Sequence, residues 1–207
     1  MKFLVLAVAL LAVAFACVDK KDNVVKVADV SGGNLNVHFQ NVVAAIYDSN
    51  GNPSCVGNRP NLKTPGIIKL ISGQATIKKQ MQLEKSGSLM ATLKKDSWLI
   101  GTVCKDGKSR NALVPDKDCQ IDLCGEASKL GHGGLCKLLE TPGVHTLGEV
   151  EGDIQGFNGT IPLPKITGVI EGILKGSWQA EFKLVSNGET VAHIKAPSNE
   201  EWINIDA

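Results

Sequence analysis

The stretch "SWQAEFKLVSNGETVAHIKA", residues 177–196, predicts two β-strands joined by a tight turn. Apolar and polar side chains alternate in residues 177–185 and again in residues 190–196, which is the pattern of strands with one buried face. The Asn187-Gly188 pair between them is the strongest short-range signal for a hairpin. The C-terminal part of the chain therefore predicts an antiparallel hairpin.

The same patterns extend through most of the chain and predict further strands at residues 35–39, 67–71, 75–84, 88–93 and 98–104. Residues 85–88 predict a hairpin turn. Twenty-two glycines and few aromatic residues are typical of short strands joined by turns. One short helix is expected at residues 118–130, with Asp118 at its N-terminus and Gly131 at its end, followed by a flexible loop at 131–134. We therefore expect a mostly β, single-domain fold with one short helix in a cysteine-rich loop.

The N-terminus has the form of a secretory signal peptide. Lys2 precedes an apolar run at residues 3–15, and Ala14-Phe15-Ala16 supplies small residues near a cleavage point. This run is too short to span a bilayer. An acylated Cys17 is the alternative, although Phe15 fits that signal poorly. The predicted division is a signal peptide at 1–16, a polar segment with one or two strands at 17–62, and the main β domain at 63–207.

Six cysteines lie at positions 17, 55, 104, 119, 124 and 136. In a secreted chain this number favours disulfide bonds. A zinc site of Cys119, Cys124, His132 and Cys136 is the alternative, but its spacing matches no common zinc pattern. Asn158-Gly159-Thr160 is a sequon that could carry a glycan, and it is equally an ordinary turn.

Composition and motifs favour binding over catalysis. The formal net charge is +1, and no dense basic cluster suggests a nucleic-acid partner. Gly107-Lys108-Ser109 lacks the spacing of a phosphate loop, and His132-Gly133-Gly134 has no nucleophile elbow to accompany it. The four histidines, at 38, 132, 145 and 193, show no metal-ligand spacing. We therefore expect a non-catalytic protein that uses no metal and no cofactor.

Residues 158–182 combine apolar side chains at helical spacing with glycines in the same run. The apolar residues are Ile166, Val169, Ile170, Ile173 and Leu174, and the glycines are Gly168, Gly172 and Gly176. A short amphipathic helix packed on the sheet is one interpretation. A mobile segment that contacts a membrane or an apolar ligand is the other.

Several motifs resemble the GM-two ganglioside activator and its invertebrate relatives, within the ML lipid-recognition class. In chain order they are "PGIIKLISGQATIKKQMQLEKSG" (65–87), "WLIGTVC" (98–104), "KDCQIDLC" (117–124), "GGLC" (133–136), "IPLP" (161–164), "LKGSWQAEFKLVSNGE" (174–189) and "VAHIKA" (191–196). The resemblance implies a β cup around an apolar cavity that holds lipid chains. It also implies a carrier that lifts a glycolipid from a membrane and presents it to a soluble hydrolase, without catalysis of its own.

The resemblance implies a mouth at residues 164–175 and the bridge Cys104–Cys119, which matches a family bridge directly. Cys124 and Cys136 lack the partner cysteines usual in the family, so we predict that they pair with each other. Cys17 and Cys55 can form a third bridge only if cleavage follows Ala16. The chain departs from the family at His193, Val144 and Thr146, where cysteines are usual. The expected mouth or membrane-facing residues are Ile166, Val169, Ile170, Ile173 and Leu174. The expected cavity lining, for which ordinary core is the alternative, is Ile68, Leu70, Ile77, Met81, Leu83, Leu93, Trp98 and Ile100.

These inferences predict a secreted or lysosomal protein that binds and transfers a glycolipid or a phospholipid. Its expected partners are lipid, a transient membrane surface and, by resemblance alone, a soluble glycosidase. No nucleic-acid partner is expected. The alternatives are an extracellular carrier of a small apolar signal, such as a pheromone or sterol, and a secreted interaction module without a ligand.

Overall fold

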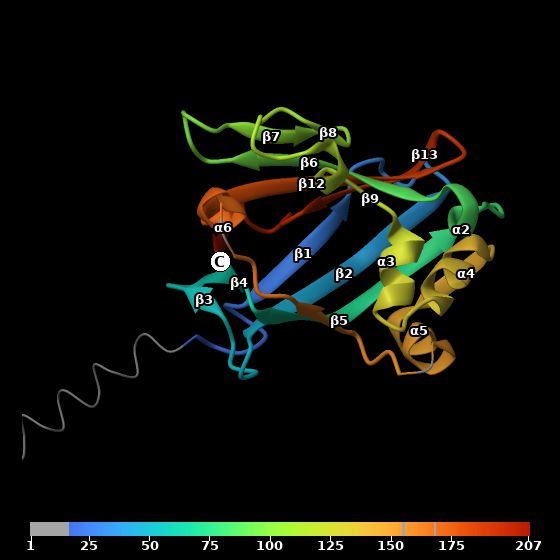
Figure 1. Cartoon of the computed structure of the whole chain (residues 1–207). Helices are drawn as coiled ribbons and strands as arrows, with labels where there is room; N and C mark the ends of the chain where they lie inside the picture. Colours follow the sequence, from blue (N-terminus) through green and yellow to red (C-terminus); the bar gives the residue numbers. More distant parts are fainter. Residues whose placement is uncertain (1–16, 155, 168) are drawn as a thin grey trace, which may run out of the picture.

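Fourteen strands form one curled, open sheet in the computed structural model, which describes residues 17–154, 156–167 and 169–207 (Figure 1). The predicted signal peptide lies outside this range. The main path of the sheet runs β10-β5-β2-β1-β13-β12-β14-β4-β3, and all pairings are antiparallel except β14 with β4. The strands are β1 (Val24–Asp29), β2 (Val37–Asp48), β3 (Cys55–Val56), β4 (Arg59–Lys63), β5 (Gly66–Ile77), β6 (Ser88–Lys95), β7 (Thr102–Lys105), β8 (Lys108–Ser109), β9 (Gln120–Ile121), β10 (Gly143–Thr146), β11 (Thr160–Leu163), β12 (Gly176–Ser186), β13 (Glu189–Ala196) and β14 (Ile203–Asp206).

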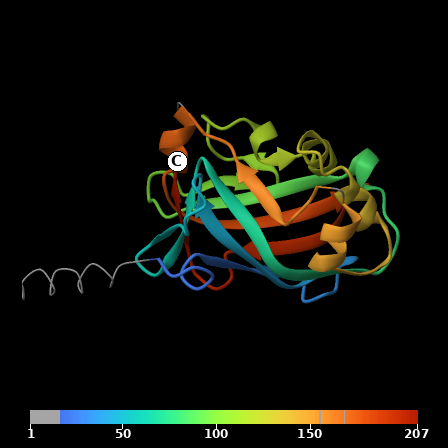
Figure 2. The same ribbon diagram turned by 90° about the horizontal axis from the view of Figure 1, so that it is seen from below.

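The helices of the described residues are all short. They are α2 (Leu83–Ser86), the 3-10 helix η2 (Asp116–Asp118), α3 (Leu123–Lys129), α4 (Gly134–Glu140), α5 (Leu147–Asp153) and α6 (Val169–Leu174). Figures 1 and 2 show α3, α4 and α5 gathered at one end of the sheet and α6 at the other. The mostly β, single-domain cup predicted from the sequence is confirmed.

The C-terminal hairpin has the predicted form. Strands β12 and β13 pair antiparallel, and Ser186 opposes Glu189 across the turn. Asn187 and Gly188 both have positive φ, 51° and 80°, as a two-residue hairpin turn requires. Strand β12 also pairs with β6 and β14, so this hairpin lies inside the sheet.

The N-terminal segment supplies more of the sheet than its sequence predicted. Strands β1 to β4 all begin within residues 17–62, and β1 and β2 lie in the middle of the path. In β2, the consecutive residues Ala44, Ala45 and Ile46 are all buried. A strand buried on both faces loses the alternation that marks a half-buried strand, so its full length was not visible in the sequence.

Two predicted strands are shorter than expected. The strand expected at 75–84 ends at Ile77 within β5, and α2 replaces the predicted turn at 85–88. The strand expected at 98–104 begins only at Thr102, because residues 98–100 form a turn between β6 and β7. The alternation in "QMQLE" therefore marks buried Met81 and Leu83 in a non-strand segment.

The helical region contains three helices where the sequence predicted one. Asp122, rather than Asp118, caps α3, and its side chain accepts a hydrogen bond from the Gly125 amide. Gly131 ends this helix with φ of 80°, as predicted. Helix α4 begins at Gly134, within the predicted flexible loop, and α5 starts at a capping box formed by Thr146 and Glu149.

The buried apolar side chains form two clusters. The first lies beside α2, α3 and α4 and contains the Cys124–Cys136 disulfide together with Val37, Ile77 and Leu83. The second lies beside α6 and contains the Cys104–Cys119 disulfide, Trp178 and Ile173. The third disulfide joins Cys17 to Cys55 at β3. All three predicted bridges are therefore present.

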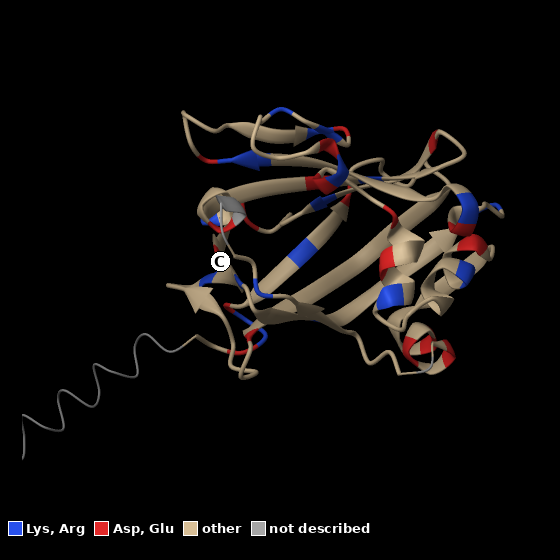
Figure 3. Cartoon of the chain, in the orientation of Figure 1, with Lys and Arg blue, Asp and Glu red and all other residues tan. Residues whose placement is uncertain are grey.

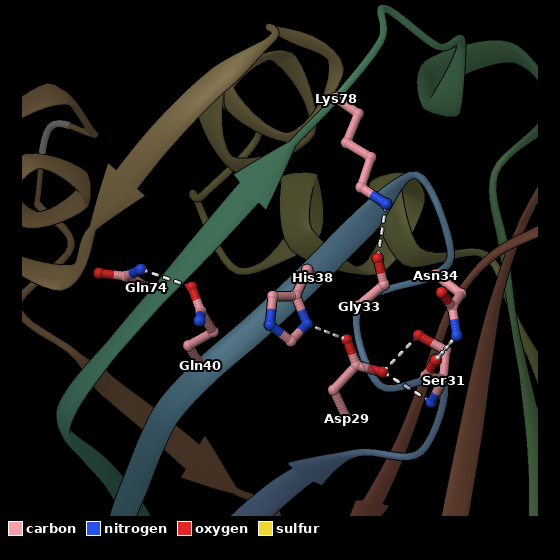
Figure 4. A network of polar contacts seen from close by, with 8 residues as sticks. All are labelled: Asp29, Ser31, Gly33, Asn34, His38, Gln40, Gln74 and Lys78. Carbon is pink, nitrogen blue, oxygen red and sulfur yellow. Dashed lines mark hydrogen bonds and ion pairs between the residues drawn. The ribbon is translucent and has the colours of Figure 1, made fainter.

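A polar network holds the loop after β1 against β2, as Figure 4 shows. His38 Nδ1 pairs with a carboxylate oxygen of Asp29, and the Ser31 amide donates to the same carboxylate at 2.7 Å. Burial raises the pKa of Asp29, but the hydrogen bonds from Ser31 and His38 outweigh it, so this pKa lies below its ordinary value. Lys78 Nζ donates to the Gly33 carbonyl at 2.5 Å and fixes the loop from the other side.

Candidate binding cavity

An apolar cavity of about 330 Å³ lies between strands β2 and β5 and helices α3, α4 and α5. It is partly open to solvent, and its surface is almost wholly apolar. The wall that the sheet contributes consists of strands β2 and β5, which have few charged residues. Strand β2 contains only Asp48 and β5 contains only Lys69 (Figure 3). The apolar residues that line it are Phe39, Val42, Leu70, Ala75, Leu123, Ala127, Leu130, Leu135, Leu138, Leu139, Leu147, Val150, Ile154, Phe157 and Ile161.

An irregularity in the sheet shapes the floor of the cavity. The register of β2 against β5 shifts between Gln40 and Ala44, where Asn41 has φ of 52°. In a regular strand, residues three apart point to opposite faces. Because the shift interrupts this alternation, Phe39 and Val42 both reach the cavity.

The helical wall follows from apolar residues at helical spacing. In α4, Leu135, Leu138 and Leu139 fall on one face, and all three line the cavity. In α5, Leu147 and Val150 do the same. The Cys124–Cys136 disulfide joins α3 to α4 behind this wall. Three helices therefore form this wall. A disulfide joins α3 to α4, and the capping box of Thr146 and Glu149 stabilises the start of α5.

Five polar residues border the cavity, and four of them direct their polar groups to partners outside it. Ser72 Oγ donates to the Asn41 carbonyl at 2.9 Å, and Gln74 Nε2 donates to Gln40 Oε1 at 2.6 Å. Lys129 Nζ donates to Glu126 Oε1 at 2.6 Å, and His145 Nε2 lies 2.8 Å from the Thr141 carbonyl. The cavity therefore presents the carbon atoms of these side chains.

His132 is the fifth polar residue, and the end of α3 determines its position. Its amide donates to the Ala127 carbonyl at 2.7 Å, while the Gly131 amide donates to the Ser128 carbonyl at 3.0 Å, which is a Schellman motif. The imidazole packs edge-on against Phe157, with ring centroids 5.0 Å apart. Nδ1 is covered by other atoms and has no hydrogen-bond partner in the described part of the chain. It adds no accessible polar surface to the cavity.

The cavity opens beside α3. Leu130 is 49% exposed although it lines the cavity, and Glu126 is exposed as well. By contrast, Ala127, Leu139, Ile154 and Phe157 are buried and form the deeper wall. A ligand with a polar end would therefore place that end near Glu126 and Leu130.

Of the eight residues expected to line a cavity, Leu70 lines this one and the other seven do not. Ile77, Met81 and Leu83 belong to the first buried cluster, and Leu93 and Ile100 pack against the second. Ile68 is half-buried opposite Ile161 in the sheet. Trp98 lies at the surface with 91% exposure, since it occupies the turn between β6 and β7. Five of the eight, those that belong to or pack against the two buried clusters, therefore fit the alternative interpretation as ordinary core.

The segment expected to form the mouth lies at the opposite end of the sheet from the cavity. Among the residues that the structure describes there, Ile173 is 8% exposed and belongs to the second buried cluster, and Leu174 packs against it. Ile166 is half-buried. The side chains of Val169 and Ile170 lie outside the described part of the structure. The described residues of this segment therefore do not border the cavity, and Ile173 and Leu174 belong to a helix that packs against the second buried cluster.

Two buried donors fix the end of α6. Lys95 Nζ donates to the Ile173 carbonyl at 2.5 Å, and Trp178 Nε1 donates to the Leu174 carbonyl at 2.6 Å. The ammonium of Lys95 also lies 5.5 Å from the centre of the Trp178 ring. Burial lowers the pKa of Lys95 from its ordinary value.

The remaining candidate groups do not come together. His38 pairs with Asp29, and His193 Nε2 lies 3.1 Å from Glu181. Within residues 17–154, 156–167 and 169–207, no cluster of histidine, cysteine and carboxylate side chains could hold a metal. In the part of the chain that the structure describes, no helix combines the length and the apolar character needed to cross a membrane. Three disulfides are typical of an oxidising compartment.

Two signals in the sequence could have revealed the helical wall. Leu135, Leu138 and Leu139 have the spacing of one helical face, and Thr146-x-x-Glu149 is a capping-box pattern. Both fall in a region where glycines favoured an irregular loop.

Compared with known proteins, the chain matches no family model and no curated protein.

Proposed function

We propose that this protein binds lipid by taking a hydrocarbon chain into the cavity between the sheet and helices α3, α4 and α5, and that it transfers or presents that lipid without catalysis. The observation that carries the proposal is an open cavity of about 330 Å³ whose surface is almost wholly apolar. Small-molecule sites generally combine apolar walls with a few polar groups that orient the ligand. Here the polar groups lie at the edge, which suits a lipid with its head outside.

The energetics of such a site favour a carrier. Each buried methylene contributes about 0.8 kcal/mol, so a chain of ten carbons supplies roughly 8 kcal/mol of gross driving force. A bilayer offers the same chain a similar gain, since both environments are hydrocarbon. Transfer between membrane and protein is then close to neutral, and the lipid can be loaded and released.

A second feature, on the α6 side of the molecule and away from the cavity, supports contact with a membrane surface (Figure 1). Trp98 and Leu99 are 91% and 73% exposed in the turn between β6 and β7. Tryptophan is favoured at the boundary between water and lipid, where its apolar ring and polar nitrogen are both accommodated. We infer that this turn touches the membrane surface. The proposal includes membership of the ganglioside-activator family and a glycosidase partner, which depend on the sequence resemblance. It also includes a lysosomal or extracellular location, which depends on the predicted signal peptide.

The test is binding of a fluorescent fatty-acid probe to the purified protein, compared between two matched variants. Val150→Phe places a larger side chain in the cavity wall and should weaken binding at least about tenfold, as steric exclusion from a close-packed site implies. Val144→Phe makes the same change at an exposed position outside the cavity and should leave binding unaltered. If the wild-type protein shows no saturable binding, the proposal is wrong and a module without a ligand is favoured.

One observation favours the related function of carrying a small apolar signal. A volume of about 330 Å³ is near the lower limit for small-molecule sites and is small for a lipid with two long chains. Native mass spectrometry of protein purified from its source separates the two functions. Acyl lipids would support lipid transfer, and a single smaller apolar compound would support the carrier.

A further inference from the structure

The size of the cavity limits how much hydrocarbon it can hold. A methylene group fills about as much space as a water molecule in the liquid, about 30 Å³. The cavity of about 330 Å³ therefore holds roughly eleven carbons. This matches one chain of medium length. Two long chains would need several times the space.

The surface of the cavity limits the chemistry of the buried part. The surface of the cavity is almost wholly apolar, and one polar atom of each bordering side chain, Ser72 Oγ, Gln74 Nε2, Glu126 Oε1 and His145 Nε2, is already paired with a partner outside it. A hydroxyl group carried inside would lose its water and find no replacement. An unsatisfied buried polar group of this kind weakens binding by about fivefold or more.

From these two observations we propose that the cavity accepts a single unbranched hydrocarbon chain, about eleven carbons deep and free of polar substituents, and that longer chains extend from it beside α3. This rests on the proposed function and narrows its ligand to one chain per molecule. Discrimination by the cavity then depends on chain length and on polar groups along the chain. The headgroup remains outside, near Glu126 and Leu130.

The experiment measures affinity for alkyl maltosides of eight to sixteen carbons, each below its micelle concentration, by displacement of the fluorescent probe. The affinity should rise about fourfold with each added methylene and level off near eleven carbons. A maltoside with a hydroxyl at the far end of its chain should bind at least about fivefold more weakly than its parent. A two-chain maltoside of the same chain length should gain nothing over the single-chain compound.

Two variants change the depth of the cavity in opposite directions. Ala127→Leu adds three carbons to the buried wall and should move the plateau to about eight carbons, and Leu138→Ala removes three and should move it to about fourteen. Circular dichroism and thermal melting check that each variant is folded. If one variant fails to fold, the position of the plateau in the other variant still tests the inference.

The outcomes separate this inference from the proposed function. If no maltoside binds saturably, both are wrong. If the chains bind but affinity keeps rising through sixteen carbons, or if the plateau stays in place in a folded variant, the protein binds lipid and the single-chain, eleven-carbon cavity is wrong.

Discussion

The two ends of the sheet are both covered by short helices, but their described residues are arranged differently: a large apolar cavity lies at the α3–α5 end, and a buried tryptophan lies beneath α6. At the α6 end, the helix is held by Lys95 and Trp178, whose side chains donate to its last carbonyl groups. Trp178 is 2% exposed and fills the volume beneath the helix. At the other end, α3, α4 and α5 face β2 and β5 mainly with leucine, valine and isoleucine side chains, and the cavity remains between them.

The difference shows that apolar spacing alone does not distinguish a filled interior from a hollow one. Both ends present apolar faces of short helices to the same sheet. A large aromatic side chain with a buried donor packs beneath the helix at one end. At the other end, mostly aliphatic side chains line the space between the disulfide-linked helices and the bulged sheet. We therefore expect stability to depend mainly on the α6 end and ligand binding on the α3–α5 end.

The largest expected effect is that of Trp178→Ala. It removes a fully packed ring and leaves the Leu174 carbonyl without its donor, so the free energy of unfolding should fall by about 3–5 kcal/mol. Urea denaturation measures it, with Trp202→Ala as the control, since Trp202 is half-buried and should lose far less. Probe binding by the folded variant should be unchanged. A larger loss for Trp202→Ala would contradict the proposed importance of the α6 end.

The next effect distinguishes two disulfides that close loops of similar length, 15 residues for Cys104–Cys119 and 12 for Cys124–Cys136. Replacing either pair by serine should lower the free energy of unfolding by about 3 kcal/mol. Only loss of Cys124–Cys136 should also weaken probe binding, because that bond joins α3 to α4. Equal loss of binding in both double variants would mean that the cavity depends on global stability.

A smaller effect is expected for Lys95→Met, which keeps the apolar length of the side chain and removes its donor. The unsatisfied Ile173 carbonyl should cost about 1–3 kcal/mol at neutral pH. Because the pKa of Lys95 is lowered in the folded state, the unfolded chain binds more protons as the pH approaches the ordinary lysine value. The stability contribution of Lys95 therefore rises with pH in this range.

Urea denaturation of wild type and Lys95→Met between neutral pH and about pH 10 measures this dependence, with the ordinary lysine pKa as the upper reference. The stability difference in favour of the wild type should grow with pH. A difference that stays constant would show that burial does not lower this pKa.

The smallest expected effect is that of Thr146→Ala, which removes the capping box of α5 and should cost about 1 kcal/mol. Hydrogen exchange should show faster exchange of the α5 amides and no change in α6. Glu149, which is exposed and hydrogen-bonded to Thr146, has a pKa below its ordinary value. The capping contribution should therefore fade at acid pH, as Glu149 becomes protonated.

Much of the β architecture could be predicted from local patterns. The β12–β13 hairpin depends on alternation and on an Asn-Gly turn, both of which are local in sequence. Gly131 could be identified as a helix end for the same reason. The strands of the N-terminal segment could not be predicted at full length, because β2 is buried on both faces and shows no alternation at Ala44–Ile46.

The candidate site was less predictable. Leu70 was expected in the cavity and lines it, while Ile77, Met81 and Leu83 point into the filled cluster. All four have the pattern of inward residues, and only the helices packed above them decide which ones face empty space. Trp98 is of a residue type common in protein interiors, yet it lies in an exposed turn, because the strand expected around it begins only at Thr102.

The sequence by itself determined the β-rich fold, the C-terminal hairpin and the number of cysteines available for disulfides, since these depend on side-chain alternation, turn chemistry and composition. The tertiary structure alone decided where the interior is hollow. That depends on the bulge in β2, on how far α3, α4 and α5 stand from the sheet, and on the presence of Trp178 beneath α6. Residues that are distant in sequence determine whether the interior volume between them is filled or empty. The spacing of these residues in three dimensions cannot be inferred from any local sequence pattern.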